Sequence, residues 1–254
     1  MESTFKIQGP KKGEHGSTSF GTTFLVGKPK PEGKEAYYVL VTAAHVLDEI
    51  DGDTAQLLIR KKKADSSYTS GFWPIRIRDK GKDLYAMHKE YESDKRVDAA
   101  ALYVDMPNGL DITLLATDFL AADSKLDEFD VHPGDELFCL GFPLYVGTES
   151  GFPILRSGTI ASYPLTPTSI YKNLLFDITV FEGNSGGPVY FVDRNRIYKG
   201  RAHLGGPIQF VVGLLKGEVE AIYYNKQEIS LAVVVPARYI IETINLLPPE
   251  SPHR

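Results

Sequence analysis

Residues 182–189, with the sequence EGNSGGPV, place a serine inside a glycine-rich run directly before the strand-forming stretch VYFV. Gly183 and Gly186 lie on either side of Ser185, and the lack of a Cβ there permits a tight turn. Such a turn can direct two backbone N–H groups at one point beside the serine oxygen. That geometry stabilises the negative oxygen of a tetrahedral acyl intermediate. On these residues alone, a glycine-rich turn with an ordinary surface serine remains an alternative.

A serine needs a neighbouring base to act as a nucleophile. Of the six histidines in the chain, His45 has the most informative surroundings. It follows the apolar run YYVLV at residues 37–41 through Thr-Ala-Ala, so it falls where a buried strand ends. A core histidine held by packing is the alternative reading of the same pattern.

The base in turn needs a carboxylate that fixes its tautomer and stabilises the imidazolium. Asp98 is the best candidate, because it directly precedes the apolar run AAALYV at residues 99–104. A carboxylate at the start of a buried strand is costly unless it is hydrogen-bonded, so it requires a partner. Asp94 and Asp105 are the next candidates, and an ordinary strand-start or Asx-turn aspartate is also possible.

The rest of the chain indicates an all-β protein. Strand-forming residues gather in short runs separated by Gly, Pro, Asn and Asp clusters, as in an antiparallel sandwich or barrel. The runs are 22–26, 37–42, 56–59, 75–77, 100–104, 136–140, 174–178, 189–192, 209–215 and 229–235. One helix is predicted near the end, where isoleucines and leucines recur at helical spacing between Pro236 and Pro248. The basic run RKKK at residues 60–63 is interpreted as a solvated turn.

Composition narrows the classes of function. The 254 residues carry 28 basic and 33 acidic side chains, a net charge of −5, which disfavours binding to nucleic acid or to an anionic membrane. Cys139 is the single cysteine, so neither an intrachain disulfide nor a Cys-rich zinc site can form. No signal peptide or membrane span is recognised, and a cytoplasmic location is expected. We expect no metal and no organic cofactor.

Three motifs in the order His, Asp, Ser resemble those of the chymotrypsin-like (trypsin-fold) serine endopeptidases. They are VTAAHV around His45, VDAAAL around Asp98 and GNSGGPVY around Ser185, which are 53 and 87 residues apart. The similarity is strongest to bacterial trypsin-like peptidases, including the HtrA-type protease domain. Further similarity comes from PGDELF at 133–138, GFP at 141–143 and SGTIAS at 157–162, so the resemblance covers roughly residues 20–244.

The resemblance implies two six-stranded antiparallel β-barrels with the active site between them. The expected division is a polar N-terminal segment 1–19, a first barrel 20–118, a linker 119–130, a second barrel 131–235 and a helix 236–248. It implies that Ser185 is the nucleophile, His45 the general base and Asp98 the orienting anion. The backbone N–H groups of Gly183 and Ser185 would form the oxyanion hole.

Departures from the family pattern carry information as well. Asn184 stands where family members that are activated by cleavage carry an aspartate, and a neutral amide cannot hold a new N-terminal ammonium by charge. Thr179 stands where trypsin itself has an aspartate at the base of its pocket. Together with Leu215, Lys216 and Gly217, it gives an expected pocket for a small or medium apolar side chain. Lys216 could instead attract an acidic side chain.

The sequence thus predicts a serine endopeptidase that acts on polypeptides. A catalytically silent or partner-activated binding protein with the same fold is the alternative, and the identity of an activating partner is not indicated. An α/β-hydrolase is disfavoured, because that fold orders its triad Ser, acid, His and needs helices alternating with strands.

Overall fold

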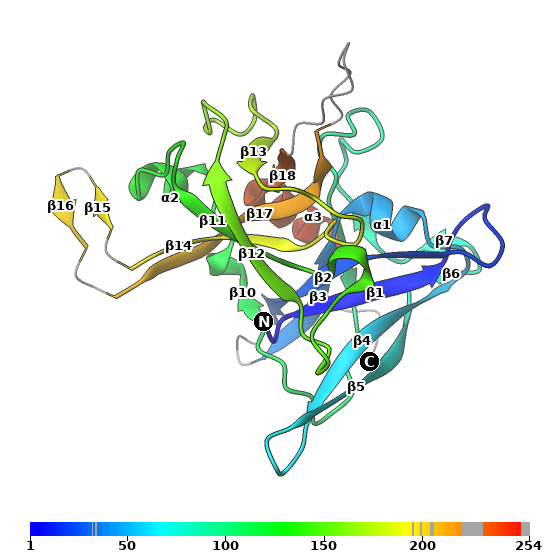
Figure 1. The fold of residues 1–254 in the computed structure, drawn as a ribbon. Helices are drawn as coiled ribbons and strands as arrows, with labels where there is room; N and C mark the ends of the chain where they lie inside the picture. Colours follow the sequence, from blue (N-terminus) through cyan, green and yellow to red (C-terminus); the bar gives the residue numbers. More distant parts are fainter. Residues whose placement is uncertain are drawn as a thin grey trace.

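The computed structural model describes residues 1–31, 33, 35–194, 196–198, 200–203, 206–219 and 231–249. Most of its regular structure is β-strand, arranged in two units that lie side by side with one longer helix between them (Figure 1). The all-β prediction with a C-terminal helix is therefore confirmed.

The first unit is an eight-stranded sheet. Its strand order is β5-β4-β1-β2-β3-β9-β8, and β10 pairs with β2 in parallel. The strands are β1 (Thr4–Pro10), β2 (Thr18–Pro29), β3 (Ala36–Thr42), β4 (Thr54–Lys62), β5 (Tyr68–Arg76), β8 (Ala86–Met87), β9 (Ala100–Tyr103) and β10 (Leu115–Ala116). A short helix, α1 (Ala44–Asp48), follows β3, and the small hairpin β6 (Arg78–Asp79) and β7 (Lys82–Asp83) follows β5.

The first residues of the chain differ from expectation. The segment 1–19, expected to be polar and to precede the first unit, contains β1, which pairs with both β2 and β4. Phe5 and Ile7 point into the core and are fully buried, whereas Lys6 and Gln8 between and beyond them are only half-buried. This is the alternation of a strand with one buried face. The surrounding polar residues masked that pattern in the sequence.

The basic run at residues 60–63 also differs from expectation. Its first three residues belong to β4 instead of a turn, and the Arg60 side chain is among the most deeply buried in the molecule. Only Lys61, Lys62 and Lys63 are exposed.

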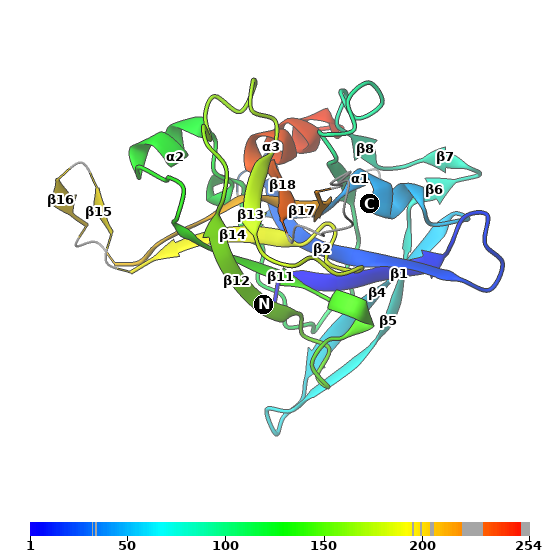
Figure 2. The same cartoon turned by 45° about the horizontal axis from the view of Figure 1, so that its top comes forward.

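The second unit is a closed six-stranded barrel in the order β11-β12-β13-β18-β17-β14. Its strands are β11 (Glu136–Gly141), β12 (Ile154–Ile160), β13 (Leu174–Asp177), β14 (Pro188–Asp193), β17 (Ile208–Glu218) and β18 (Ala232–Pro236). The connection from the first unit contains η1 (Thr117–Phe119) and α2 (Asp123–Glu128), and η2 (Pro143–Tyr145) follows β11. The strands β15 (Ile197–Tyr198) and β16 (Arg201–Ala202) pair in a separate hairpin, which projects from the barrel in both ribbon views (Figures 1 and 2).

The helix α3 (Ala237–Leu246) follows the second unit in sequence but packs into the core of the first unit. It starts directly after Pro236, a residue that suits the first turn of a helix. Its buried residues Tyr239, Ile240 and Ile244 belong to the core cluster of the first unit, together with Val39 and Leu102. The barrel of the second unit has its own core, and Phe176, Phe191 and Phe210 are among its largest members. Within the described part of the chain, no helix is long and apolar enough to cross a membrane.

Candidate active site

Strand pairing in the first unit brings His45 and Asp98 together. Thr42, the last residue of β3, is the antiparallel partner of Ala100, the first residue of β9. His45 lies three residues beyond the end of β3, in the first turn of α1, and Asp98 lies two residues before the start of β9. Because antiparallel neighbours place the end of one strand beside the start of the other, both side chains emerge at the same edge of the sheet.

Asp98 holds His45 by two hydrogen bonds. Its Oδ2 lies 2.6 Å from Nδ1 of the imidazole, and its Oδ1 accepts from the backbone N–H of His45 at 3.1 Å. The Asp98 side chain is 2% exposed, so its charge is compensated mainly by these contacts. A carboxylate accepts hydrogen bonds, so Nδ1 carries the proton, and the neutral ring presents Nε2 as the basic nitrogen.

The pKa of His45 is raised from its ordinary value of 6.5. Burial favours the neutral ring and acts to lower this pKa, and the charge of Lys216 acts in the same direction. The hydrogen bond to Asp98, the negative charge of Asp98 and that of Glu49 together outweigh these effects. The imidazolium is therefore stabilised relative to a free histidine.

The other two acid candidates lie elsewhere. The Asp94 carboxylate binds Arg96 and Lys172, with Nη2 of Arg96 at 2.8 Å and Nζ of Lys172 at 3.0 Å. Asp105 is exposed, and its backbone carbonyl accepts from the indole of Trp73. Of the three, only Asp98 is hydrogen-bonded to His45.

The turn that contains Ser185 is fixed to both units. The backbone carbonyl of Ser185 accepts from the N–H of Thr22 in β2 at 2.8 Å, and the N–H of Gly186 donates to Leu215 in β17 at 2.7 Å. A methyl group at Gly186 would lie 2.1 Å from Oγ1 of Thr42 and 3.0 Å from the backbone nitrogen of Ala43. The serine turn therefore packs directly against the end of β3, two to three residues before His45.

A second turn, over residues 181–184, precedes the serine. It is closed by the N–H of Asn184, which donates to the carbonyl of Phe181 at 3.1 Å, and Gly183 has a φ of +93°. The carbonyl of Glu182 accepts from the N–H of Leu144 at 2.8 Å. In a planar trans peptide the C=O and the following N–H point in opposite directions. The N–H of Gly183 therefore points away from Leu144.

Leu144 and Tyr145, in η2, support this arrangement through an unusual backbone. Both have a positive φ, 49° and 66°, a region that costs roughly 1–2 kcal/mol for a residue with a side chain. The Leu144 N–H makes the contact to Glu182, and the ring of Tyr145 stacks on Phe20 with centroids 3.4 Å apart. The contacts to the serine region offset the strain of this loop.

Thr22 is a site residue that sequence reasoning counted only as part of a strand. Its buried Oγ1 donates to the carbonyl of Gly183 at 2.6 Å and accepts from the N–H of Phe142 at 3.2 Å. Together with its backbone bond to Ser185, Thr22 connects β2 to both sides of the serine turn. The available signal in the sequence was a threonine in a strand that continues into the apolar run at residues 24–26, because a hydroxyl buried there requires partners.

A comparison with known protein families identifies the family of this chain. Residues 21–197, more than half of the chain, match the family described as the trypsin-like peptidase domain. The chain belongs to the trypsin-like peptidase family. It is a serine peptidase, as its resemblance in sequence implied. A search of curated proteins found no match.

Solved structures share the fold of this trypsin-like peptidase at low sequence identity. The protease Anisep from Arthrobacter nicotinovorans is 14% identical, with a TM-score of 0.56 over 97% of this chain and 95% of that one. The active form of the Rv3671c protease from M. tuberculosis is 17% identical, with a TM-score of 0.53 over 100% and 84%. A variant of the HtrA-type protease AlgW, solved with a decapeptide, is 15% identical, with a TM-score of 0.51 over 96% and 63%.

The expected pocket residues of the peptidase have different surroundings. Thr179 is exposed, and its carbonyl accepts from the guanidinium of Arg156. The side chain of Leu215 is buried in the core of the second barrel, so only its backbone can line a pocket. Lys216 and Gly217 are half-buried at an irregularity in the pairing of β17 with β18, and the charge of Lys216 acts on His45.

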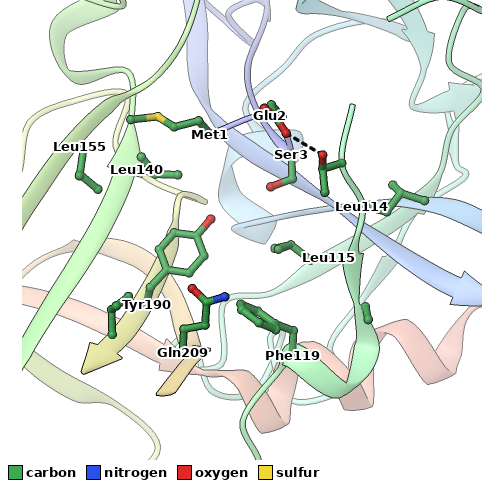
Figure 3. A pocket seen from close by; sticks show the side chains of 13 residues that line it. Met1, Glu2, Ser3, Leu114, Leu115, Phe119, Leu140, Leu155, Tyr190 and Gln209 are labelled. Carbon is green, nitrogen blue, oxygen red and sulfur yellow. Dashed lines mark hydrogen bonds between the residues drawn. The ribbon is translucent and has the colours of Figure 1, made fainter. Parts of the chain in front are cut away.

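The peptidase also has a hollow between its two units that is separate from His45, Asp98 and Ser185. It has a volume of about 560 Å³ and is lined on one side by residues 1–3 and 113–116, and on the other by β11, β12 and β14. Figure 3 shows the ring of Tyr190 and the side chain of Gln209 at this hollow. The hydroxyl of Thr113 donates to the Glu2 carboxylate at 2.6 Å. Neither His45, Asp98 nor Ser185 lines it.

Proposed function

We propose that this trypsin-like peptidase cleaves polypeptides internally through a catalytic triad of Ser185, His45 and Asp98. The observation that carries the proposal is the double hydrogen bond between Asp98 and His45, at the edge of the sheet against which the serine turn packs. Asp98 keeps the proton on Nδ1, so Nε2 is free to take a proton from the Ser185 hydroxyl.

The proposed reaction has two stages, acylation and then deacylation of Ser185. Oγ of Ser185 attacks the peptide carbonyl carbon while its proton passes to Nε2 of His45. The tetrahedral intermediate then collapses, the C–N bond breaks, and the leaving amine takes that proton from His45. Water next attacks the carbonyl carbon of the acyl-enzyme and gives a proton to Nε2 of His45. The ester C–O bond then breaks, His45 returns that proton to Oγ of Ser185, and the acid product is released with the Ser185 hydroxyl restored.

The oxyanion hole of this proposal consists of the N–H groups of Gly183 and Ser185. The bond from Leu144 to the Glu182 carbonyl supports this assignment, because it turns the Gly183 N–H away from the loop after β11. A side chain at Gly183 would also collide with the Phe142 carbonyl and the Phe20 ring, at 2.3 and 2.4 Å. One such donor is typically worth about 3–4 kcal/mol of barrier.

For the residue before the scissile bond, we retain the proposal of a small or medium apolar side chain. The backbone of Leu215, Lys216 and Gly217 would form one wall, and Thr179 would lie at the far end. The exposure of Thr179 and the lack of a carboxylate at this position argue against a strong preference for Lys or Arg.

Labelling with a fluorophosphonate probe tests the nucleophile. The wild-type protein is expected to form a stable adduct, and Ser185→Ala is expected to form none. Ser157→Ala, which removes an exposed serine of β12, is the matched control and should label like the wild type. Equal labelling of the wild type and Ser185→Ala would refute the assignment of Ser185. A wild type that never labels, alone or with cell extract added, would favour the catalytically silent binding protein.

A further inference from the structure

We propose that Lys6 selects substrates that carry a carboxylate within the first three residues after the scissile bond. This inference rests on the proposed function, since it assigns a contact to the leaving segment of a peptide bound at Ser185.

Phe20 borders the serine turn, and with Tyr145 and Phe72 it forms an aromatic cluster around Lys6. Phe20 stacks on Tyr145, and its ring lies so close to Gly183 that a methyl group there would be 2.4 Å from Cε2. Tyr145 and Phe72 are 51% and 47% exposed, so the cluster is open to an incoming chain. Both ribbon views show the green loop after β11 lying against β1 and β2 (Figures 1 and 2).

The cluster lies on the side of Ser185 that the leaving segment would occupy. The proposed pocket for the residue before the scissile bond uses β17, which is bonded to the serine turn through Gly186. The turn is bonded to β2 through the carbonyl of Ser185. Since the acyl side of the substrate takes β17, β2 remains for the residues that follow the scissile bond.

The edge of β2 at Phe20 is available for an extended chain. Residues two apart in a strand direct their backbone groups to the same side, so the N–H and C=O of Phe20 face the same side as the N–H of Thr22, which binds Ser185. The pairing of β2 with β3 begins only at Phe24. A peptide can therefore add to this edge by backbone hydrogen bonds, with its side chains meeting the aromatic cluster.

Lys6 supplies the positive charge at this position. It is the antiparallel partner of Thr22, which places its side chain on the same sheet face as that of Phe20. Its Nζ lies 5.2 Å from the ring centroid of Tyr145, 5.8 Å from Phe20 and 6.0 Å from Phe72.

No carboxylate of the described residues pairs with Lys6, and burial alone lowers its pKa. The Glu182 carboxylate at the oxyanion turn acts on Lys11 instead, whose pKa is raised chiefly by its ion pair with Glu14. A partly desolvated ammonium without a counter-charge attracts a substrate carboxylate more strongly than an exposed lysine does.

The distance between the Lys6 ammonium and the turn at Gly183 determines which substrate residues Lys6 can contact. Phe20 borders Gly183, and Nζ of Lys6 lies 5.8 Å from the Phe20 ring centroid, so the ammonium is within about 10 Å of the turn at Gly183. An extended chain rises about 3.3 Å per residue, which places the carboxylate within about three residues of the scissile bond.

The experiment measures kcat/KM on fluorescence-quenched peptides that share one cleaved acyl side. Each peptide carries Glu, Gln or Lys at one of the first three positions after the cleaved bond, with an amidated C-terminus. A second set ends in a free carboxylate at the same positions, which separates a side-chain carboxylate from a chain terminus. Active enzyme is counted by fluorophosphonate titration, so each rate refers to molecules with a working Ser185.

Wild-type enzyme is expected to prefer Glu over Gln by about 2- to 5-fold at one of these positions, the range typical of a single ion pair with partial exposure. Lys6→Gln should remove this preference, and Lys6→Glu should invert it in favour of Lys. An inverted preference cannot result from misfolding. Lys62→Gln removes a lysine over the ring of Tyr68 in the same sheet and should keep the wild-type preference.

The outcomes separate the two proposals. Failure of the wild type to label or cleave would refute the proposed function itself. Labelling and cleavage without a Glu preference, or with a preference that survives in Lys6→Glu, would refute the role of Lys6 alone. A preference seen only in the free-carboxylate peptides would assign Lys6 to the C-terminus of short substrates.

Discussion

At the scale of single residues, Asp98 sets the protonation of His45. The raised pKa of His45 means that the folded protein binds a proton more tightly than the unfolded chain does. This stabilisation is fully present below pH 6.5 and is lost as the pH rises through the folded-state pKa. In the proposed mechanism the active form is the opposite one, because only the neutral ring can accept the Ser185 proton.

The pH dependence of activity follows with a definite sign. We expect kcat/KM of the wild type to fall on the acid side through a pKa above 6.5. In Asp98→Asn the hydrogen bond to a charged group is lost, while burial and Lys216 still favour the neutral ring, so the His45 pKa should move downward. NMR titration of the His45 ring is the measurement. The kcat should also fall by about 10⁴, because the amide no longer fixes the tautomer.

Asp94→Asn is the matched control for that titration. Asp94 is bonded to Arg96 and Lys172 and not to His45, so its loss should leave the His45 titration and the acid limb in place. A downward shift of the His45 pKa in Asp94→Asn, with none in Asp98→Asn, would contradict the assignment of the acid.

At the scale of elements, β2 positions the serine turn. Thr22 makes three hydrogen bonds across from the first sheet. It donates to the carbonyls of Ser185 and Gly183 and accepts from the N–H of Phe142. Strands are stiff and their register is fixed by pairing on both sides, so β2 can hold a turn that has no regular structure of its own. The turn that contains Gly183 thus depends on a side chain in the other unit.

Thr22→Val removes the two hydrogen bonds of the Thr22 hydroxyl and keeps a side chain of nearly the same shape. We expect a loss of about 1–3 kcal/mol in the free energy of unfolding, because the buried Gly183 carbonyl and Phe142 N–H lose their partner. We also expect kcat to fall by about tenfold, which corresponds to about 1.4 kcal/mol of barrier. Urea unfolding and steady-state kinetics measure the two effects.

Thr23→Val, in the same strand β2, is the control variant for Thr22→Val. Thr23 is equally buried, and its Oγ1 donates to Val41 within the first sheet at 2.7 Å. This variant should lose stability without the loss of kcat. A similar drop in kcat in both variants would show that general destabilisation, and not the link from β2, lowers activity.

At the scale of the whole molecule, Arg60 joins the two units. Its guanidinium lies between the rings of Phe5 and Phe152, with both centroids 4.5 Å away. It donates to the carbonyl of Gly151 at 3.0 Å and to those of residues 1 and 2. Burial lowers the pKa of Arg60 to about 10, so the side chain is still charged at neutral pH. Arginine suits this position because its planar group stacks on rings and donates in several directions at once.

Loss of this side chain should destabilise the molecule as a whole. Arg60→Ala leaves the Gly151 carbonyl without its partner and a cavity between two rings, so we expect a loss of about 3 kcal/mol in the free energy of unfolding. Arg60→Lys should not recover the lost stability, because an ammonium has no planar group to stack on the rings of Phe5 and Phe152. Arg76→Ala, on the exposed side of the neighbouring strand β5, should change stability by no more than about 0.5 kcal/mol. Urea titration checks all three variants, and full stability in Arg60→Lys would contradict the stacking argument.

The sequence by itself determined the fold class, the helix after Pro236 and the three candidate catalytic residues. These properties are carried by short windows: strand runs, a glycine-framed serine, and a histidine and an aspartate next to buried strands. Local patterns of this kind specify which face of a strand is buried and which residue type stands at its end.

Only the tertiary structure decided which groups meet. The contact of Asp98 with His45, the pairing of β1, the three bonds of Thr22 and the burial of Arg60 all join residues far apart in the sequence. The direction of the Gly183 N–H depends on Leu144, and the surroundings of the Lys6 ammonium depend on the three rings near it. Periodicity fixes the side on which a residue lies but not its partner, because partners are set by strand register and by the packing of the two units against each other.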